Sequence, residues 1–335
     1  MSMSSSTFFS TVSNIRNSLT SAMNEVDEQL LLMGKSLIPL IPEMSSHIMA
    51  AGGKRLRPLL TLACAELFSY KGKDHILLAA CVECMHTATL LHDDVVDEGI
   101  LRRGIETANN RWGNKSSILV GDFLLGQAFS HMVQPGSLEV LRVLSNAAKI
   151  ISEGEVEQLV LQKKQNWPSL AEYKSVITAK TAILFAAACE VGAIIAKQEP
   201  EICAALHKYG LHLGISFQIM DDILDIVAEE EVLGKPAGND LFDGKITLPM
   251  IYAYENADKN TKLEWQNLFL EKKSPHEVRL KTLRKLLESS QGIEKAQADA
   301  VDHAEKSYKA LDFLPDSWLK EQLQNLAKHA SDRHF

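Results

Sequence analysis

The sequence predicts an all-α protein built as a single domain. Long apolar segments follow one another along the chain, and they are too long for strands and lack the alternation of apolar and polar residues that strands show. Turns that contain proline or glycine separate these segments. We find no strand-rich segment, no repeat of fixed period and no long linker in the 335 residues. One helical domain over residues 1–335 is therefore the simplest expectation.

Six central helices are expected from the apolar segments. The first is apolar on nearly every side, which is typical of a buried helix rather than of an amphipathic surface helix. A capping box marks the start of the fifth, because Ser169 stands three residues before Glu172. The six predicted helices are Pro58–Phe68, His75–His92, Ser116–Met132, Leu138–Leu161, Leu170–Lys197 and Glu201–Val227.

After about Asn256 the composition changes to charged, amphipathic helix. We predict helices over Lys272–Ser290 and Ile293–Leu314, with apolar residues on one side and charged residues on the other. Such helices form a peripheral layer around a core.

Composition and charge exclude several classes of protein. Apolar residues make up 46% of the chain, which is enough for a large core, and the formal net charge of -8 argues against a nucleic-acid partner. The serine-rich N-terminus lacks the basic and apolar regions of a signal peptide. No stretch approaches the ~20 uninterrupted apolar residues of a membrane span. We therefore expect a soluble, cytoplasmic protein without a transmembrane segment.

The cysteines are expected to be buried free thiols in a reducing compartment. Cys81 and Cys84 have the spacing of half a metal or redox motif, but no second pair accompanies them. The five cysteines are Cys64, Cys81, Cys84, Cys189 and Cys203.

Two clusters of aspartates end two of the apolar helices. In the first, Asp93 and Asp97 stand four positions apart, so they lie on one side of a helix, with Asp94 beside them. In the second, a polar stripe with helical spacing crosses an otherwise apolar segment. This stripe consists of Gln218, Asp221, Asp222 and Asp225.

Clustered carboxylates repel one another and favour protonation unless a cation lies between them. Carboxylate oxygens are natural ligands of hard divalent cations, and Mg²⁺ also accepts phosphate oxygens from a substrate. Two facing aspartate clusters therefore indicate a site that holds a Mg²⁺-bound diphosphate.

Basic residues accompany the aspartates. Gly52 and Gly53 precede Lys54 and Arg57 at the expected start of a helix, where backbone N–H groups can also bind an anion. The remaining basic residues close in sequence to the clusters or to the apolar helices are Arg102, Arg103, Lys180, Lys235 and Lys245.

Together these residues resemble the trans-isoprenyl diphosphate synthase family, over a pattern that runs from Gly52 to Pro249. The resemblance rests on Gly52-Gly53-Lys54-Arg55-Leu56-Arg57-Pro58, Leu91-His92-Asp93-Asp94-Val95-Val96-Asp97, Gly121-Asp122, Glu153-Gly154-Glu155, Lys180-Thr181, Phe217-Gln218-Ile219-Met220-Asp221-Asp222-Ile223-Leu224-Asp225 and Gly244-Lys245.

The resemblance implies a bundle of antiparallel helices around a large central cavity, in a homodimer. It implies that isopentenyl diphosphate and an allylic diphosphate are the substrates, with about three Mg²⁺ bound to the allylic diphosphate. The implied metal ligands are Asp93, Asp97, Asp221 and Asp225, with Asp94 and Asp222 as second ligands or supports.

The resemblance also implies two diphosphate-binding sites, and it makes Lys180 a catalytic residue as well. The isopentenyl diphosphate site would consist of Lys54, Arg57, His86 and Arg103. The allylic diphosphate site would consist of Arg102, Lys180, Thr181, Gln218, Lys235 and Lys245.

The product length is expected to depend on the residues before the first aspartate cluster. Short-chain members commonly carry aromatic residues where this chain has Ala88 and Thr89. These small residues, with Met85 one turn deeper, leave room for a long product. The segment from His86 to His92 resembles the octaprenyl-making branch, which supplies quinone side chains. We therefore expect a C40 product from a farnesyl primer, within a range of C35 to C50. Because such a product is strongly hydrophobic, we also expect transient contact with a membrane.

Four other functions were weighed. A phosphohydrolase leaves the second aspartate cluster unexplained, and a terpene cyclase normally lacks the signature of Lys54 and Arg57. A silent subunit of a heteromeric synthase usually loses one aspartate motif, whereas this chain keeps both. A shorter-chain synthase, making geranylgeranyl or farnesyl diphosphate, is the remaining alternative.

Overall fold

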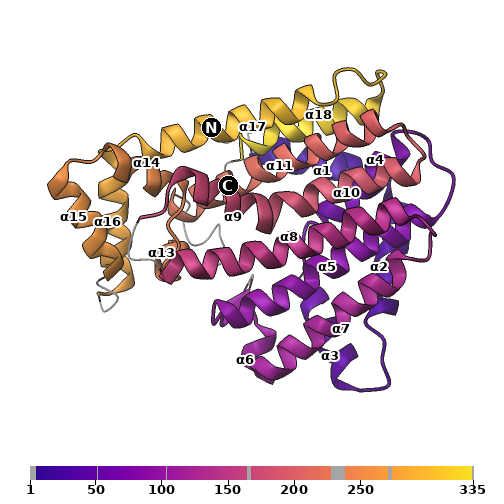
Figure 1. Cartoon of the computed structure of the whole chain (residues 1–335), viewed down its shortest axis with the longest axis horizontal. Helices are drawn as coiled ribbons and strands as arrows, with labels where there is room; N and C mark the ends of the chain where they lie inside the picture. Colours follow the sequence, from indigo (N-terminus) through magenta and orange to yellow (C-terminus); the bar gives the residue numbers. More distant parts are fainter. Residues whose placement is uncertain are drawn as a thin grey trace.

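The computed structural model describes residues 5–50, 52–102, 104–163, 167–227, 238–270 and 274–333. In these ranges the chain is almost entirely helical, which confirms the predicted all-α class (Figure 1). A two-residue hairpin, β1 (Leu101–Arg102) paired with β2 (Ile105–Glu106), follows the first aspartate cluster. Arg103 and Lys235 lie outside the described residues.

The N-terminal half contains three helices that were not predicted, followed by the four expected long helices and one short helix, α6, that was also not predicted. The first three are α1 (Ser5–Ser18), α2 (Thr20–Met33) and α3 (Leu40–Ala50). The next five are α4 (Leu56–Glu66), α5 (Asp74–Val96), α6 (Ala108–Trp112), α7 (Asn114–Met132) and α8 (Leu138–Lys163).

The C-terminal half begins with a correction. The predicted helix Leu170–Lys197 is divided into α9 (Leu170–Ile177), the π-helical turn η1 (Thr178–Ala182) and α10 (Ile183–Ile195). The capping box at Ser169 and Glu172 is confirmed at the start of α9. The other helices are α11 (Pro200–Val227), α13 (Asn239–Phe242), α14 (Leu248–Asn256), α15 (Lys259–Leu270), α16 (His276–Glu288), α17 (Gly292–Lys309) and α18 (Trp318–Ala330).

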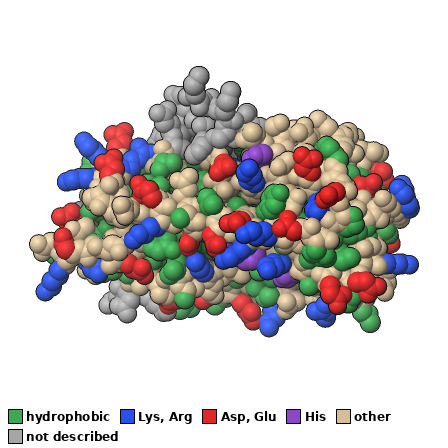
Figure 2. Space-filling model, turned by 90° about the horizontal axis from the view of Figure 1, so that it is seen from above, with side chains coloured by type: hydrophobic (Ala, Val, Ile, Leu, Met, Phe, Trp, Pro, Cys, Tyr) green, Lys and Arg blue, Asp and Glu red, His purple; other side chains and the backbone are tan. Residues whose placement is uncertain are grey.

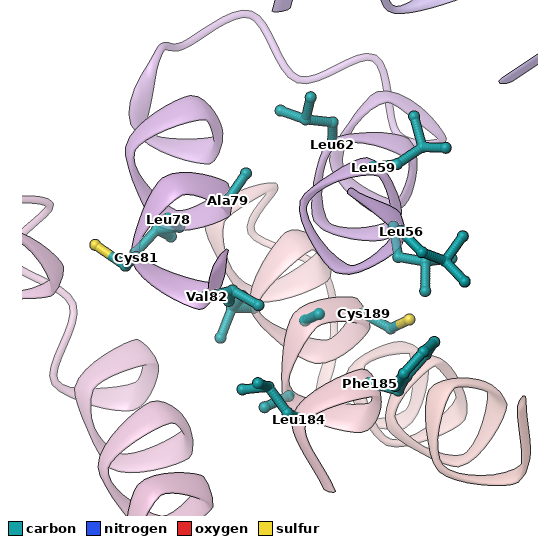
Figure 3. Close-up of a cluster of buried hydrophobic side chains, with 14 of the residues drawn as sticks. Leu56, Leu59, Leu62, Leu78, Ala79, Cys81, Val82, Leu184, Phe185 and Cys189 are labelled. Carbon is teal, nitrogen blue, oxygen red and sulfur yellow. The ribbon is translucent and has the colours of Figure 1, made fainter. Parts of the chain in front are cut away.

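The core lies where α4, α5 and α10 meet. Residues on all sides of α4 and α10 are buried, as the broad apolar surface of these segments predicts. Leu59 and Leu62 of α4 lie close to Val82 of α5 and to Cys189 of α10 (Figure 3). The expected peripheral layer is present: α15 and α16 lie at one end of the molecule, and α17 covers α11 (Figure 1).

Two glycines let α11 approach α10 and the end of η1 closely. A Cβ atom at Gly210 would lie 2.8 Å from the Cα of Ala186, and one at Gly214 would lie 2.6 Å from the Cα of Ala182. Neither backbone can move away without separating the two helices. The close packing fixes α11, which carries the second aspartate cluster, against the centre of the core.

Two helical stretches are long and apolar enough to cross a membrane by composition. They are Asp74–Val96 and Leu170–Ile195, and 67% and 72% of their most apolar windows are buried inside the protein. Burial of this extent is typical of core helices in a soluble protein. On the face drawn in Figure 2, acidic and basic side chains are interspersed.

Candidate active site

One cavity of about 840 Å³ is lined by two aspartates of each cluster and by most of the predicted basic residues; Asp94 and Asp225 do not line it. It lies between the C-terminal part of α5, the C-terminal part of α11 and the segment from α8 to η1. The predicted residues that line it are Lys54, Arg57, His86, Thr89, Asp93, Asp97, Arg102, Lys180, Thr181, Gln218, Asp221, Asp222 and Lys245. Residues more than a hundred positions apart in the sequence therefore meet at one place.

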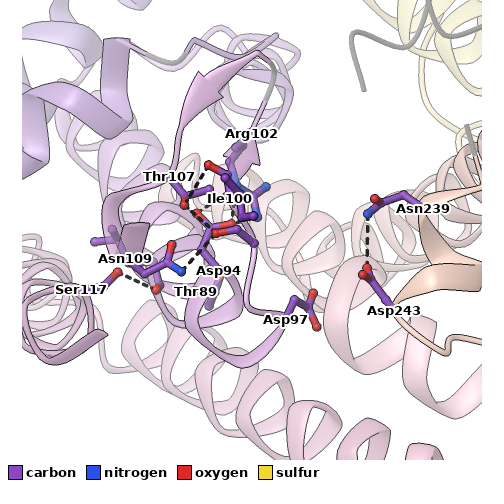
Figure 4. A network of polar contacts seen from close by, with 12 residues as sticks. Thr89, Asp94, Asp97, Ile100, Arg102, Thr107, Asn109, Ser117, Asn239 and Asp243 are labelled. Atoms are coloured by element: carbon purple, nitrogen blue, oxygen red, sulfur yellow. Dashed lines mark hydrogen bonds and ion pairs between the residues drawn. The ribbon is translucent and has the colours of Figure 1, made fainter. Parts of the chain in front are cut away.

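The first aspartate cluster lies where α5 ends. Asp97 is the residue at which the helix stops, and its carboxylate accepts a hydrogen bond from the Nζ of Lys245 at 2.8 Å. Asp94 points away from the cavity, where Arg102 of β1 donates to it from both Nε and Nη2, at 2.9 Å and 2.7 Å (Figure 4). This two-point contact holds the hairpin against the end of the helix.

Asp93 is the most strongly perturbed carboxyl of the first cluster. Its pKa is raised to about 7, with burial as the largest cause; Lys180 and Arg102 oppose the shift, and the nearby carboxylates of Glu155 and Asp97 add to it. A cation placed beside a carboxyl in this environment strongly favours its ionised form.

The second cluster places three neighbouring carboxylates in three different environments. Asp221 faces the cavity and forms an ion pair with Arg333 at 2.8 Å. Asp222 is buried and accepts hydrogen bonds from Tyr173 at 2.6 Å and from Gln218 at 2.7 Å. Asp225 is also buried and accepts a hydrogen bond from the backbone N–H of Asp240 at 3.1 Å. The aspartates of the predicted polar stripe therefore differ in their surroundings: one forms an ion pair at the cavity, one accepts side-chain hydrogen bonds and one accepts a backbone hydrogen bond.

The carboxylates fit a divalent cation by chemistry, although they are not arranged around one. Among the residues that the structure describes, no group of three or more His, Cys, Asp and Glu side chains is placed to hold a metal ion. Lys245 and Arg333 neutralise Asp97 and Asp221 instead. Oxygen ligands from two helices that face one cavity nonetheless suit Mg²⁺ that arrives bound to a diphosphate.

The basic residues near the start of α4 are held against aromatic rings. The Nζ of Lys54 lies 3.9 Å from the ring centre of Phe9, and the guanidinium of Arg57 lies 4.6 Å from that of Phe185. The helix begins at Leu56, so Pro58 is its third residue rather than its first. Arg55 precedes it in the left-handed region and pairs with Glu83 at 2.8 Å.

Lys180 and Thr181 belong to the π-helical turn. Lys180 pairs with Glu155 of α8 at 2.7 Å, and Thr181 donates to the side-chain oxygen of Gln218 at 2.8 Å. π-Helical turns occur often at functional sites, because the extra residue changes the direction in which side chains point.

Lys245 lies among three carboxylates. Burial by itself would lower its pKa, but Asp97, Asp240 and Asp243 raise that pKa well above its ordinary value. The ammonium group is therefore charged throughout the physiological range of pH.

Of the three residues assigned to chain length, Thr89 lines the cavity together with Leu90. Met85 and Ala88 are each 1% exposed and belong to the main apolar core.

Several cavity residues were missed by the sequence analysis. Tyr173 follows directly from a capping box, and Glu155 belongs to a landmark of the resemblance, but neither was assigned a role. Arg333 lies in a charged C-terminal region with no motif around it, and its side chain is only 3% exposed. Its guanidinium lies 3.9 Å from the ring centre of Phe217. Nothing in the local sequence indicates that this arginine reaches the cavity.

The chain is similar to known proteins over nearly its whole length. Residues 38–287 match the family described as polyprenyl synthetase. The octaprenyl diphosphate synthase of Escherichia coli (strain K12) is 40% identical over 320 residues, which are 95% of this chain and 98% of the relative. The all-trans-nonaprenyl-diphosphate synthase (geranyl-diphosphate specific) of Rhodobacter capsulatus is 38% identical over 302 residues, which are 89% of this chain and 90% of the relative.

A solved structure has the same fold. The polyprenyl synthase from Caulobacter crescentus CB15, complexed with calcium and isoprenyl diphosphate, superposes with a TM-score of 0.91. It is 40% identical in sequence, and the match covers 96% of this chain and 98% of that one.

Proposed function

The chain belongs to the polyprenyl synthetase family, and from this premise we propose which reaction it performs, with which residues, and to what product length. It is a long-chain trans-prenyltransferase, which condenses isopentenyl diphosphate with an allylic diphosphate. We propose farnesyl diphosphate as the primer and C40 octaprenyl diphosphate, for quinone side chains, as the product. The octaprenyl and nonaprenyl relatives both support a product within the range of C35 to C50.

One observation carries the assignment of the site: aspartates of both clusters line the same cavity as five of the predicted basic residues. These are Lys54, Arg57, Arg102, Lys180 and Lys245. The reaction breaks the C–O bond of the allylic diphosphate, the isopentenyl double bond attacks the resulting cation, and a proton is then lost. Negative charge grows on the departing diphosphate, so fixed cations around it lower the barrier.

The carboxylates would hold the metal. We propose that Asp93, Asp97, Asp221 and Asp225 bind about three Mg²⁺, which would neutralise the departing diphosphate. The divalent ion in the Caulobacter structure supports metal use in this family, although that ion is calcium. The buried contacts of Asp94 with Arg102 and of Asp222 with Tyr173 suit these two aspartates to a supporting role.

The basic residues would bind the two substrates. The proposed isopentenyl diphosphate site consists of Lys54, Arg57, His86 and Arg103. The proposed allylic diphosphate site consists of Arg102, Lys180, Thr181, Gln218, Lys235 and Lys245. Lys180 would act directly on the departing diphosphate. The apolar side chains that share the cavity, among them Leu90, Ile151 and Phe185, would keep water from the allylic cation.

We also propose that the protein is a soluble, cytoplasmic homodimer that meets membranes only transiently, to release its product. An exposed stripe on α7 supports the dimer: Ile118 and Leu119 are 42% and 67% exposed. Gly126 lies on the exposed side of the same helix, where a Cβ atom would meet nothing within 4 Å. Small and apolar residues on one side of a surface helix are typical of an interface between helices.

The test incubates purified protein with Mg²⁺, farnesyl diphosphate and labelled isopentenyl diphosphate, and sizes the products after dephosphorylation. We expect a series that ends near C40. Asp93→Ala and Asp221→Ala should each lower kcat at least about a hundredfold, because each removes a proposed metal ligand.

Asp316→Ala is a matched control, since the Asp316 side chain is fully exposed and does not line the cavity. It should retain the wild-type rate. Products that stop at C15 to C20 would contradict the proposed length, and an absence of isopentenyl incorporation would contradict the proposed reaction. Product formed from the allylic diphosphate alone would indicate a cyclase.

A further inference from the structure

Tyr173 is a buried residue of the cavity wall with no role in the assignment above. It lies on α9, is 6% exposed, and packs among apolar side chains of α11, including Ile219 and Ile223. Its hydroxyl group donates to the Oδ2 of Asp222 at 2.6 Å. The ring is thus fixed by apolar packing, and the hydroxyl group is fixed by a carboxylate.

This hydrogen bond is one end of a chain of polar contacts. The Oδ1 of Asp222 accepts from the Nε2 of Gln218 at 2.7 Å, and the Oε1 of Gln218 accepts from the hydroxyl group of Thr181 at 2.8 Å. Tyr173 and Thr181 belong to one segment, α9 and η1, whereas Gln218 and Asp222 belong to α11. The segment is therefore joined to α11 at two points.

The two joints lie on either side of the residues that matter for substrate binding. Lys180 and Thr181 follow Tyr173 on the segment, and Asp221 lies beside Asp222 on α11. The segment changes from α-helix to π-helix between Tyr173 and Thr181, so α-helical geometry alone does not fix the direction of Lys180. Glu155 holds the ammonium group of Lys180, and the contact of Tyr173 with Asp222 fixes where the backbone of the segment lies against α11.

We propose that Tyr173 is a positioning residue for the allylic diphosphate site. Through Asp222 it fixes the separation and orientation of Lys180 and Thr181 relative to Asp221, so that cations and carboxylates act on the same diphosphate. This inference rests on the proposed function. It concerns the allylic substrate alone, because the described residues assigned to isopentenyl diphosphate lie elsewhere: Lys54 just before α4, Arg57 on α4 and His86 on α5.

The test is Tyr173→Phe, which keeps the buried ring and removes only the hydroxyl group. We expect the Kd and KM for farnesyl diphosphate to rise about tenfold, since a hydrogen bond to a carboxylate contributes roughly this much. The Kd and KM for isopentenyl diphosphate should remain within about twofold of wild type. Each Kd is measured by titration calorimetry with one substrate alone in the presence of Mg²⁺, which separates binding from turnover.

Tyr252→Phe is the matched control. Tyr252 also donates to a carboxylate, the Oδ2 of Asp299 at 2.9 Å, but it does not line the cavity. Its variant should leave both Kd values and both KM values unchanged. If Tyr173→Phe acted only by destabilising the fold, the Kd values for both substrates would rise together.

A double-mutant comparison tests whether the hydroxyl group acts through Asp222. In the Asp222→Leu background, which has no hydrogen-bond acceptor at this position, Tyr173→Phe should raise the Kd for farnesyl diphosphate by much less than tenfold. Equal changes in both Kd values, or no change for farnesyl diphosphate in an active wild-type enzyme, would overturn the positioning role. An inactive wild-type enzyme would instead contradict the proposed function itself.

Discussion

At the scale of single residues, the three aspartates of α11 each depend on a partner from another segment of the chain. The spacing of Asp221, Asp222 and Asp225 predicts one polar side of a helix, and the structure has that helix. The spacing does not indicate their partners: Arg333 pairs with Asp221, Tyr173 donates a hydrogen bond to Asp222, and the backbone N–H of Asp240 donates one to Asp225. Such partners come from distant segments, and their pairing depends on tertiary packing rather than on local pattern.

Thr89 offers a prediction about product length. It is one turn of α5 before Asp93, and it lines the cavity in which the growing chain would lie. Thr89→Phe should place a ring across that space and shorten the main product from near C40 to C20 or below, while the rate of the first condensation changes little. Products are sized chromatographically after dephosphorylation.

Ala88→Ser is a useful comparison, because Ala88 is buried in the core beside Thr89 and does not line the cavity. It should leave the product length unchanged. An unaltered product length for Thr89→Phe would mean that the chain grows along another path.

At the scale of elements, the sequence predicted the long helices well and the interruptions poorly. No proline or turn-forming pair interrupts the sequence from Leu170 to Lys197, so nothing in the pattern indicates the π-helical turn at Thr178–Ala182. The helices α1 to α3 were missed for a different reason. In α2 the buried Met23, Val26 and Leu30 have the spacing of one side of an amphipathic helix. This signal is present in the sequence but was not used.

The close packing of α11 on α10 predicts a large loss of stability at one glycine. In Gly210→Ala the new Cβ would meet the backbone of Phe185 and Ala186, which belongs to a buried helix and cannot yield. We expect a loss of about 1–3 kcal/mol in the free energy of unfolding, in spite of the better helix propensity of alanine. Denaturation by urea measures it.

Lys208→Ala is the control on the exposed side of the same helix. It should change the free energy of unfolding by no more than about 0.5 kcal/mol. Similar losses in both variants would show that the close contact of Gly210 with α10 is not the cause of the destabilisation.

At the scale of the whole molecule, the all-α class was predicted from the length of the apolar segments and from the absence of alternating apolar and polar residues. Neither signal depends on the identity of any single residue. The central cavity followed only from the resemblance, because no local pattern encodes a space that α5, α8, η1 and α11 enclose together. Arg103 and Lys235, which lie outside the described residues, keep the roles proposed for them.

Stability of the whole molecule should depend on pH through a pair of histidines between α11 and α17. The Nδ1 atoms of His212 and His303 lie 2.9 Å apart, so one ring donates a hydrogen bond to the other. The two Nδ1 atoms cannot both carry a proton in this contact. Burial lowers the pKa of His212 to about 4, helped by His303, Lys306 and Lys208. Burial also lowers the pKa of His303, helped by Lys306 and Lys174.

Between about pH 4 and pH 6.5 the unfolded chain binds more protons at these rings than the folded chain does. Stability should therefore rise with pH over this range, by an amount on the order of 1 kcal/mol after allowance for the partly exposed rings. Urea denaturation of wild type at pH 5 and pH 7.5 measures the rise. It should be smaller in His212→Asn, and an equal rise in that variant would assign the effect to other groups.

The position of Arg333 has a consequence for how the chain folds. Its partners are Asp221 on α11 and the ring of Phe8 on α1, and nearby Thr11 and His329 meet across 318 positions of sequence. Contacts between such distant segments carry the largest entropic cost of loop closure, and they tend to form late. We expect an intermediate in which α4, α5 and α10 have already packed while Asp221 still lacks its arginine. Competence to bind substrate would then appear as the last event of folding, well after most of the helical structure has formed.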